Sequence, residues 1–333
     1  MGKVVLVTGV SRLVGGLTAR ALSEHDDVDR VIGVDSVPPP HSIGSARFVR
    51  ADIRNPIIGK VIRQEQVDTV VHLGVITTPR QAGGRTAQKE INVIGTMQLL
   101  AACQKAESLN RLVVKSTGAV YGASPRDPAM FTEDMTPRRA PTAGFPRDSV
   151  EVENYVRGFA RRRPDVDITL LRMANIAGPG LRTPLSDYFR MRAMPVPMGY
   201  DGRIQVLHLD DAVRSLVTSA TSEATGIINI AGDGIVTVRQ AARLAGRPTV
   251  PFVPVLAGAV TSGARAARLG AFDSSQWQWL CYGRALDTTR MRELLGFTPD
   301  HTTRDTIREV FGADPVWPPS PGVAISSLIG DRS

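Results

Sequence analysis

Short apolar runs alternate with amphipathic segments along the first half of the chain. The runs are rich in β-branched residues, and patterns with helical spacing separate them. Buried runs separated by helices indicate a parallel sheet that is covered on both faces. We expect strands at 4–7, 31–34, 47–50, 69–73, 111–115 and 168–172, and helices at 17–23, 86–105 and 150–161. The fold class is therefore α/β, a doubly wound parallel sheet, which binds ligands at the carboxyl ends of its strands.

The pattern changes after Asn175. Residues 177–205 hold many Pro, Gly, Met and Arg residues, which is typical of a lobe of short helices and loops. A strand at 206–208 and a helix at 210–219 return to the regular pattern, and residues 233–311 mix helices with turns. We predict a sheet domain at 1–176 and 206–232, a smaller lobe at 177–205 and 233–312, and a Pro-rich C-terminal tail at 313–333.

Composition limits the class of protein. Of the 333 residues, 42% are hydrophobic and 22% are charged, which excludes a disordered chain. No apolar run reaches about 18 residues, so we expect no membrane span and no membrane partner. The first ten residues already form a strand-and-turn pattern, which predicts no secretory signal. Two cysteines predict free thiols in a reducing, cytoplasmic compartment.

The net charge of +8 raises the question of nucleic-acid binding. Only five of the 40 basic residues are lysines, and the arginines are dispersed along the chain. A nucleic-acid binder combines basic residues along one face with aromatic residues for stacking, and aromatic residues are only 5% here. We attribute the charge to composition and expect no nucleic-acid partner.

A glycine-rich turn follows the first predicted strand. Residues 8–16 read TGVSRLVGG between a strand and a helix, and a helix N-terminus presents free N–H groups to a pyrophosphate. Asp35 ends the second strand, about twenty residues beyond Gly15, where a carboxylate binds the adenosine ribose hydroxyls. These features predict a dinucleotide site, and Asp35 favours NAD because it would repel the 2′-phosphate of NADP. The alternative is a structural turn followed by a surface aspartate.

This turn and further segments along nearly the whole chain resemble the extended short-chain dehydrogenase/reductases, specifically the nucleotide-sugar epimerases and dehydratases. The further segments are Asp52-Ile53, His72-Leu73-Gly74, NVIGT at 92–96, KSTGAVYG at 115–122, LRMANIAGP at 171–179, QVLHLDD at 205–211 and LDTTR at 286–290. The resemblance implies a Rossmann-type dinucleotide-binding domain with a C-terminal substrate lobe, NAD as cofactor and a nucleotide sugar or related small molecule as substrate. A homodimer is left open.

The resemblance also assigns individual residues. The implied cofactor-binding positions are Gly9, Ser11, Arg12, Leu13, Val14, Asp35, Asp52, Ile53, Leu73, Gly74, Val75 and Asn92. The implied substrate-binding positions are Tyr121 and Asn175. An arginine that meets the diphosphate in the family would fall at Ile204, so other arginines would have to replace it. The candidates are Arg182, Arg190, Arg192 and Arg284.

The turn departs from the family pattern. Extended members place glycine at the position of Arg12, and shorter relatives place it at that of Leu13. The middle glycine lets the backbone approach the pyrophosphate, so we expect NAD binding to be weakened or rearranged. Arg12 could place its guanidinium on a phosphate, or it could be a solvated residue of the turn.

The helix that carries the catalytic motif in the family departs further from the family pattern. The family uses Tyr-x-x-x-Lys, in which the tyrosine is the acid/base and the lysine lowers its pKa and holds the nicotinamide ribose. Phe145 and Ser149 occupy these two positions. No lysine follows Lys115 anywhere in the chain, so the motif is absent. Thr117 matches the strand residue that fixes the substrate oxygen, or it is a plain strand-end threonine.

This loss determines the functional hypothesis. Positioned acid–base catalysis is worth roughly 10²–10⁴-fold, so we expect a protein that is weakly active, unconventional or non-catalytic. The alternative is an active NAD-dependent epimerase, dehydratase or reductase that uses Tyr121, Asp148 or Lys115, although each has a simpler structural explanation. His208 with Asp210 and Asp211 is interpreted as a strand end and a helix cap, so we expect no metal.

Overall fold

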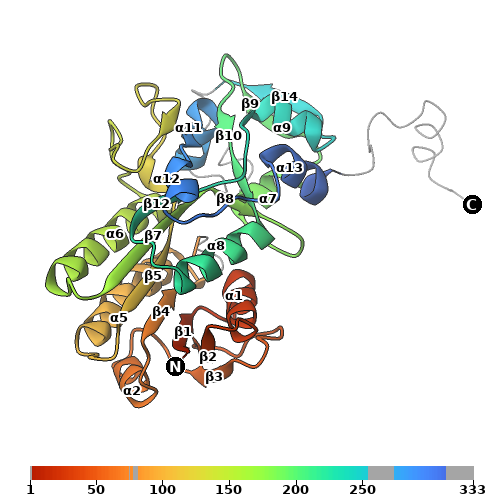
Figure 1. Cartoon of the computed structure of the whole chain (residues 1–333). Coiled ribbons are helices and arrows are strands. Elements are labelled where there is room, and N and C mark those ends of the chain that lie inside the picture. The colour runs from red at the N-terminus through yellow and green to blue at the C-terminus, as the bar shows by residue number, and fades with distance from the viewer. Residues whose placement is uncertain (1, 75, 78–81, 254–273, 313–333) are drawn as a thin grey trace, which may run out of the picture.

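The computed structural model describes residues 2–74, 76–77, 82–253 and 274–312 (Figure 1). Its centre is a seven-stranded parallel sheet in the order β12-β7-β5-β4-β1-β2-β3. The strands are β1 (Lys3–Thr8), β2 (Val28–Asp35), β3 (Arg47–Arg50), β4 (Thr69–His72), β5 (Arg111–Thr117), β7 (Asp167–Met173) and β12 (Gly226–Ile230). The predicted α/β class is confirmed, and six of these strands fall on predicted runs. β12 was not among them.

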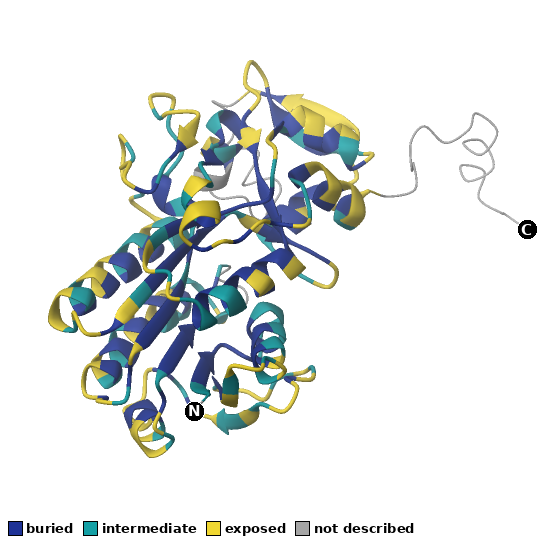
Figure 2. Cartoon of the chain, in the orientation of Figure 1, coloured by how far each residue is buried: buried dark blue, intermediate teal, exposed yellow. Residues whose placement is uncertain are grey.

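Helices cover both faces of the sheet. One face packs against α1 (Leu13–Ser23) and α8 (Leu209–Thr221), and the other packs against α2 (Ile57–Gln64), α5 (Gly95–Gln104) and α6 (Gly144–Arg162). Side chains alternate across a strand, so Val5 and Val7 join the first apolar cluster while Leu6 joins the second. Figure 2 shows the strands buried between the helices, whose outer faces are exposed.

Four helices differ from the sequence prediction, and the first of them, α1, begins at Leu13 rather than 17. The helix expected at 86–105 is α4 (Arg85–Lys89), a π-helical turn (Glu90–Ile94) and then α5. α6 begins at Gly144 rather than 150, because Pro146 lies in its first turn, where the missing N–H has no helical acceptor. The short helix α2 was not predicted, although Ile58 and Ile62 give it an apolar face.

The remaining elements form a lobe around a third apolar cluster. They are α7 (Pro184–Phe189), β9 (Met194–Pro197), β10 (Arg203–Ile204), β13 (Val236–Thr237), α9 (Val238–Leu244), β14 (Thr249–Phe252), α11 (Ser274–Tyr282) and α13 (Thr303–Phe311). Short elements connect the lobe to the sheet: β6 (Met130–Phe131), β8 (Asn175–Ala177), β11 (Val206–His208), β15 (Ala285–Leu286) and α12 (Thr289–Glu293).

The lobe is built from segments that precede and follow residues 206–232 along the chain. The division into the two predicted domains stays a prediction, and the predicted tail at 313–333 falls outside the described residues. Within the described ranges, no helix is long and apolar enough to cross a membrane.

Candidate functional site

A cavity of about 1370 Å³ lies at the carboxyl ends of β1 and β5, between the sheet and the lobe. The strand order reverses between β1 and β4, and such a switch point is where open α/β sheets bind ligands. The lining residues come from the turn after β1, the end of β5, the start of α6, the segment after β7 and the lobe. They include Ser11, Arg12, Leu13, Val14, Gly15, Leu73, Lys115, Thr117, Phe145, Asn175, Arg182, Trp277, Trp279 and Arg284.

Close backbone contacts explain two glycines of the turn. Gly9 has φ of +80°, and a Cβ there would lie 3.0 Å from Cα of Gly74. A Cβ on Gly15 would lie 2.2 Å from the carbonyl oxygen of Gly9. Arg12, by contrast, has φ of −97° and ψ of 148°, which is ordinary extended backbone. The absent middle glycine therefore changes side-chain bulk and charge without straining the chain.

The N-terminus of α1 faces the cavity. The first N–H groups of any α-helix have no partner within the helix, and the side chain of Arg12 does not cap them. Ser11, Arg12 and Leu13 line the cavity at this end. Exposed N–H groups at a helix N-terminus form an anion site, so the residues present fit a dinucleotide pyrophosphate. Burial lowers the pKa of Arg12, and the nearby charge of Asp35 opposes this effect.

Asp35 is held beside the turn at the end of β2. Its Oδ2 accepts hydrogen bonds from the backbone N–H of Ser11 at 3.0 Å and from the Ser11 hydroxyl at 2.6 Å. Its Oδ1 accepts the N–H of Ser36 at 2.7 Å. Oδ1 also accepts the Ser36 hydroxyl at 3.4 Å, and because a carboxylate offers about four lone-pair positions, a ribose hydroxyl would have to replace this long bond. Asp35 itself does not line the cavity.

A hydrogen-bond chain positions the segment after β4. The N–H of Leu73 donates to Oγ1 of Thr8, whose hydroxyl donates to Nδ1 of His72 at 2.8 Å. Nε2–H of His72 then donates to Oγ1 of Thr96 at 2.9 Å, and Thr96 donates to the carbonyl oxygen of Asn92. Burial, together with the charge of Lys115, lowers the pKa of His72 to about 4, so the ring is neutral.

Asn92 fixes the same segment directly. Its side chain accepts the N–H of Ile76 at 2.7 Å and donates to the carbonyl oxygen of Ile76 at 2.8 Å. Asn92 belongs to the π-helical turn, and π-helical turns are frequent at functional sites. Neither Asn92 nor Gly74 lines the cavity, and Val75 lies outside the described residues.

The implied adenine pair also lies outside the cavity wall. Asp52 accepts hydrogen bonds from the guanidinium of Arg54, the shortest at 2.6 Å, and these bonds lower the pKa of Asp52. Ile53 is buried, and its side chain is so near Gly95 that a Cβ there would lie 2.8 Å from it.

Thr117 and Phe145 line the cavity at the end of β5 and the start of α6. Thr117 ends β5, and its Oγ1 accepts the N–H of Ala119 at 3.1 Å. Phe145 presents an aromatic ring without a hydroxyl at the start of α6. Ser149, one turn later, is 3% exposed and donates to the carbonyl oxygen of Phe145 at 3.0 Å. Neither α6 residue can supply the acid or the cation of the family motif.

The structure separates the three substitute acid/base candidates. Tyr121 is buried and its hydroxyl is hydrogen-bonded to Asn229 and Arg172, while Asp148 is buried against the guanidinium of Arg85. Neither lines the cavity, whereas Lys115 does. Burial, together with the charge of Arg12, lowers the pKa of Lys115 to about 8.

A buried ion pair connects this region to the sheet. Glu153 of α6 and Arg172 of β7 are joined by two hydrogen bonds at 2.7 and 3.0 Å. The hydroxyl of Ser116 donates to the same carboxylate at 2.7 Å. Arg172 also donates to the hydroxyl of Tyr121, so the implied substrate residue is part of the interior network.

Several polar groups line the lobe side of the cavity. Asn175 is exposed in the wall, and Ile204 is buried away from it. Among the candidate arginines, Arg182 and Arg284 line the cavity, but Arg190 and Arg192 do not. The guanidinium of Arg284 donates to the carbonyl oxygen of Gly122, and burial lowers its pKa to about 10.

Two tryptophans of α11 also line the cavity. By their positions in the sequence, Trp277 and Trp279 are expected either to pack the lobe or to form an aromatic platform for a base. Trp277 does pack against Phe252, with ring centroids 4.6 Å apart, yet both indoles contribute to the wall. Helical spacing alone could not distinguish these two roles.

Comparisons with known proteins agree with this architecture. A protein-family model described as the NAD dependent epimerase/dehydratase family matches residues 5–231. The uncharacterized protein Rv0501 of Mycobacterium tuberculosis is 46% identical over 324 residues, covering 95% of this chain and 86% of that protein. A UDP-glucose 4-epimerase of Corynebacterium glutamicum is 25% identical over 361 residues, covering 99% and 97%.

A solved structure is similar over nearly the whole chain. MoeE5 in complex with UDP-glucuronic acid and NAD superposes with a TM-score of 0.70 at 25% identity, covering 92% of this chain and 96% of that one. The family model spans the dinucleotide turn, β5, α6 and the segment after β7, which together build most of the cavity. This chain belongs to the NAD dependent epimerase/dehydratase family.

Proposed function

We propose that this protein binds NAD and a nucleotide sugar in the cavity but lacks the Tyr–Lys acid/base chemistry of its family. The observation that carries the proposal is that Phe145, to which the resemblance assigns the position of the family's tyrosine, lines the cavity. Ser149 occupies the lysine position and is buried. A phenyl ring cannot transfer a proton, and a serine hydroxyl cannot act as a cation.

The turn after β1 supports the cofactor half of the proposal. The N-terminus of α1 suits a pyrophosphate, and Asp35 beside it favours the free ribose hydroxyls of NAD over the 2′-phosphate of NADP. When bound, NAD supplies a hydride acceptor. Arg12 occupies the middle glycine position, so we expect the affinity for NAD to be lower than with glycine there.

The size and lining of the cavity support the substrate half. Ligand pockets are usually about 300–1,000 Å³, so a cavity of about 1370 Å³ has room for two ligands. Arg182, Arg284 and Asn175 offer hydrogen-bond donors to a diphosphate, and Trp277 offers a surface for a base. Two of the comparison proteins carry UDP-sugars in their descriptions, a UDP-glucose 4-epimerase and MoeE5 in complex with UDP-glucuronic acid.

A second candidate function is an active enzyme of the same class that uses Lys115 to move the proton. Lys115 and Thr117 are two residues apart on β5, so they project to the same face of the sheet, and both line the cavity. A lysine whose pKa is near 8 falls in the range that general bases use. The predicted role of Thr117, to fix the substrate oxygen, is common to both candidates.

Calorimetry and a turnover assay distinguish the two candidates. NAD and UDP-glucose are titrated into the wild type, and conversion of UDP-glucose and UDP-galactose is followed both as NADH formation and as sugar-nucleotide products, because epimerases and dehydratases return the hydride to the sugar and release no net NADH. Binding without turnover supports the first candidate. Turnover that increases as pH rises through about 8, and that Lys115→Met removes but the exposed control Lys105→Met does not, supports the second. Absence of nucleotide binding would refute both.

A further inference from the structure

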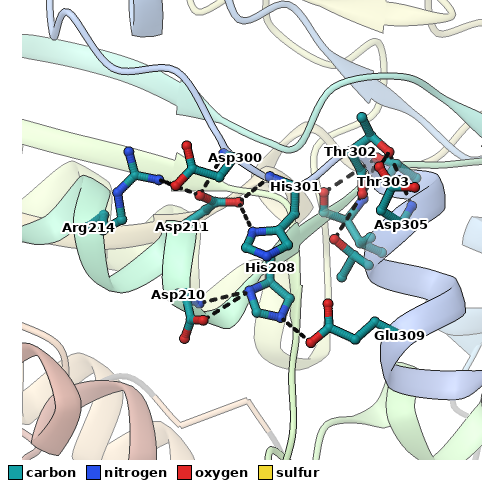
Figure 3. Close-up of polar contacts among 12 residues, drawn as sticks. His208, Asp210, Asp211, Arg214, Asp300, His301, Thr302, Thr303, Asp305 and Glu309 are labelled. Atoms are coloured by element: carbon teal, nitrogen blue, oxygen red, sulfur yellow. Dashed lines mark hydrogen bonds and ion pairs between the residues drawn. The ribbon is translucent and has the colours of Figure 1, made fainter.

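Two histidines meet where the sheet joins the lobe, away from the cavity. His208 ends β11 and precedes α8, and His301 lies shortly before α13, which carries Glu309 (Figure 3). The two rings stack with centroids 3.9 Å apart and an angle of 27° between their planes. None of these three residues lines the cavity.

The three side chains have the spacing of metal ligands. One nitrogen of each histidine and a carboxylate oxygen of Glu309 all lie within 4.8 Å of one another. Zinc bonds of about 2.0–2.1 Å in a tetrahedral site put neighbouring ligand atoms about 3.4 Å apart. Nε2 of His208 and Oε1 of Glu309 are already 3.5 Å apart. The widest pair needs to close by at most about 1.4 Å, and the stacked rings have to tilt so that both lone pairs meet at the ion; the side chains of His301 and Glu309 are 30% and 49% exposed and can adjust.

His208 has a buried nitrogen that the protein does not satisfy. The residue is 2% exposed, and its Nε2 has no hydrogen-bond partner among the described residues. Native structures rarely leave a buried polar group unsatisfied without a reason, because the group loses its hydrogen bonds to water and gains none. This nitrogen points toward Glu309, where a bound cation would satisfy it (Figure 3).

His301 is already oriented as metal-binding histidines are. Its Nδ1 lies 3.0 Å from Oδ2 of Asp211, a buried carboxylate that also accepts the N–H groups of Asp300 and His301. When Nδ1–H donates to Asp211, Nε2 carries the free lone pair. A carboxylate on the second nitrogen fixes the tautomer of most metal-binding histidines.

Asp210 can provide the same support for His208. Nδ1 of His208 accepts the N–H of Asp210 at 3.2 Å, and Oδ2 of Asp210 lies 3.7 Å from that nitrogen. A cation on Nε2 requires the ring proton on Nδ1, so Nδ1 would stop accepting the N–H of Asp210 and would donate to this carboxylate instead.

We propose that His208, His301 and Glu309 bind one divalent transition-metal ion of the zinc type, with water as the fourth ligand. Two imidazoles and one carboxylate suit zinc, whereas magnesium and calcium require oxygen ligands. The ion would join the start of α8 to α13 of the lobe and stabilise their contact. The inference does not rest on the proposed function. The sequence prediction of no metal considered Asp210 and Asp211 as partners, and it had no signal for His301 or Glu309.

Zinc titration of the full chain, stripped with a chelator and carrying no histidine tag, tests the proposal. We expect calorimetry to give one zinc per chain, and Co²⁺ to give the visible absorption of a tetrahedral site. At a hundredfold excess over Kd, zinc should raise Tm by roughly 5 °C.

Variants show whether these residues are the ligands. Glu309→Gln should weaken zinc binding at least tenfold while leaving the metal-free Tm unchanged. Glu107→Gln, the same change at another exposed glutamate, should bind zinc like the wild type. His301→Asn keeps a polar side chain and should abolish the cobalt spectrum, so the test does not depend on one variant. No zinc binding by the wild type, or identical titrations of the wild type and Glu309→Gln, would overturn the proposal.

Discussion

Restoring the family motif is the sharpest test of the degenerate catalytic helix. Phe145→Tyr adds a hydroxyl to a ring that lines the cavity beside Lys115 and Thr117. Ser149→Lys adds an ammonium one helical turn away. Positioned acid–base catalysis is worth roughly 10²–10⁴-fold, or about 3–5 kcal/mol of the barrier. The double variant should therefore oxidise UDP-glucose or UDP-galactose at least a hundredfold faster than the wild type.

Packing around Ser149 determines how much stability the Ser149→Lys substitution costs. The side chain is 3% exposed, so a lysine there must displace its neighbours, and overpacking typically costs 1–3 kcal/mol of stability. The double variant should unfold at a lower urea concentration than the wild type while still binding NAD. Calorimetry with NAD and urea denaturation therefore accompany every kinetic measurement.

The single variants separate the two added groups. Phe145→Tyr alone should oxidise UDP-sugars little faster than the wild type, because a tyrosine without the lysine keeps a pKa near 10. Phe145→Tyr with Ser149→Met is the matched control, since methionine fills similar space without a charge. The reasoning fails if the wild type already turns over at ordinary enzyme rates of roughly 1–10³ per second. It also fails if the folded, NAD-binding double variant is no faster than the methionine control.

Three further predictions concern the cofactor, pH and the interior. Calorimetry should show tighter binding of NAD than of NADP, and Asp35→Asn should reduce that preference; a wild type that prefers NADP would contradict the role of Asp35. Because the pKa of His72 falls to about 4 in the folded protein from an ordinary 6.5, the unfolded chain binds the proton first as the solution is acidified. The free energy of unfolding, measured by urea denaturation, should thus decrease by about 3 kcal/mol between pH 6.5 and 4, and His72→Gln should flatten this dependence. An equally steep dependence in His72→Gln would show that other groups cause it. Glu153→Ala leaves Arg172 buried and unpaired and should cost about 3–5 kcal/mol in urea denaturation at pH 7; a loss under 1 kcal/mol would show that water reaches the pair.

Much of this protein is determined by local sequence. A buried strand needs only a short β-branched run, so six of the seven sheet strands could be predicted, together with the turn and Asp35 that follow two of them. The absence of Tyr-x-x-x-Lys is a matter of residue identity alone, because no lysine follows Lys115. The family resemblance depends on the same local segments, and the family match confirms it.

Only the tertiary structure determined which side chains line the same cavity or contact one another. Tyr121, Asp148 and Lys115 were equivalent candidates in the sequence, and only packing shows that Lys115 lines the cavity while the other two are enclosed by arginine partners. His208 and Glu309 are brought together in the same way, by the docking of α13 against β11. Sequence patterns record which face of an element is apolar, but a contact between distant elements depends on how those faces pack, and no local pattern contains that information.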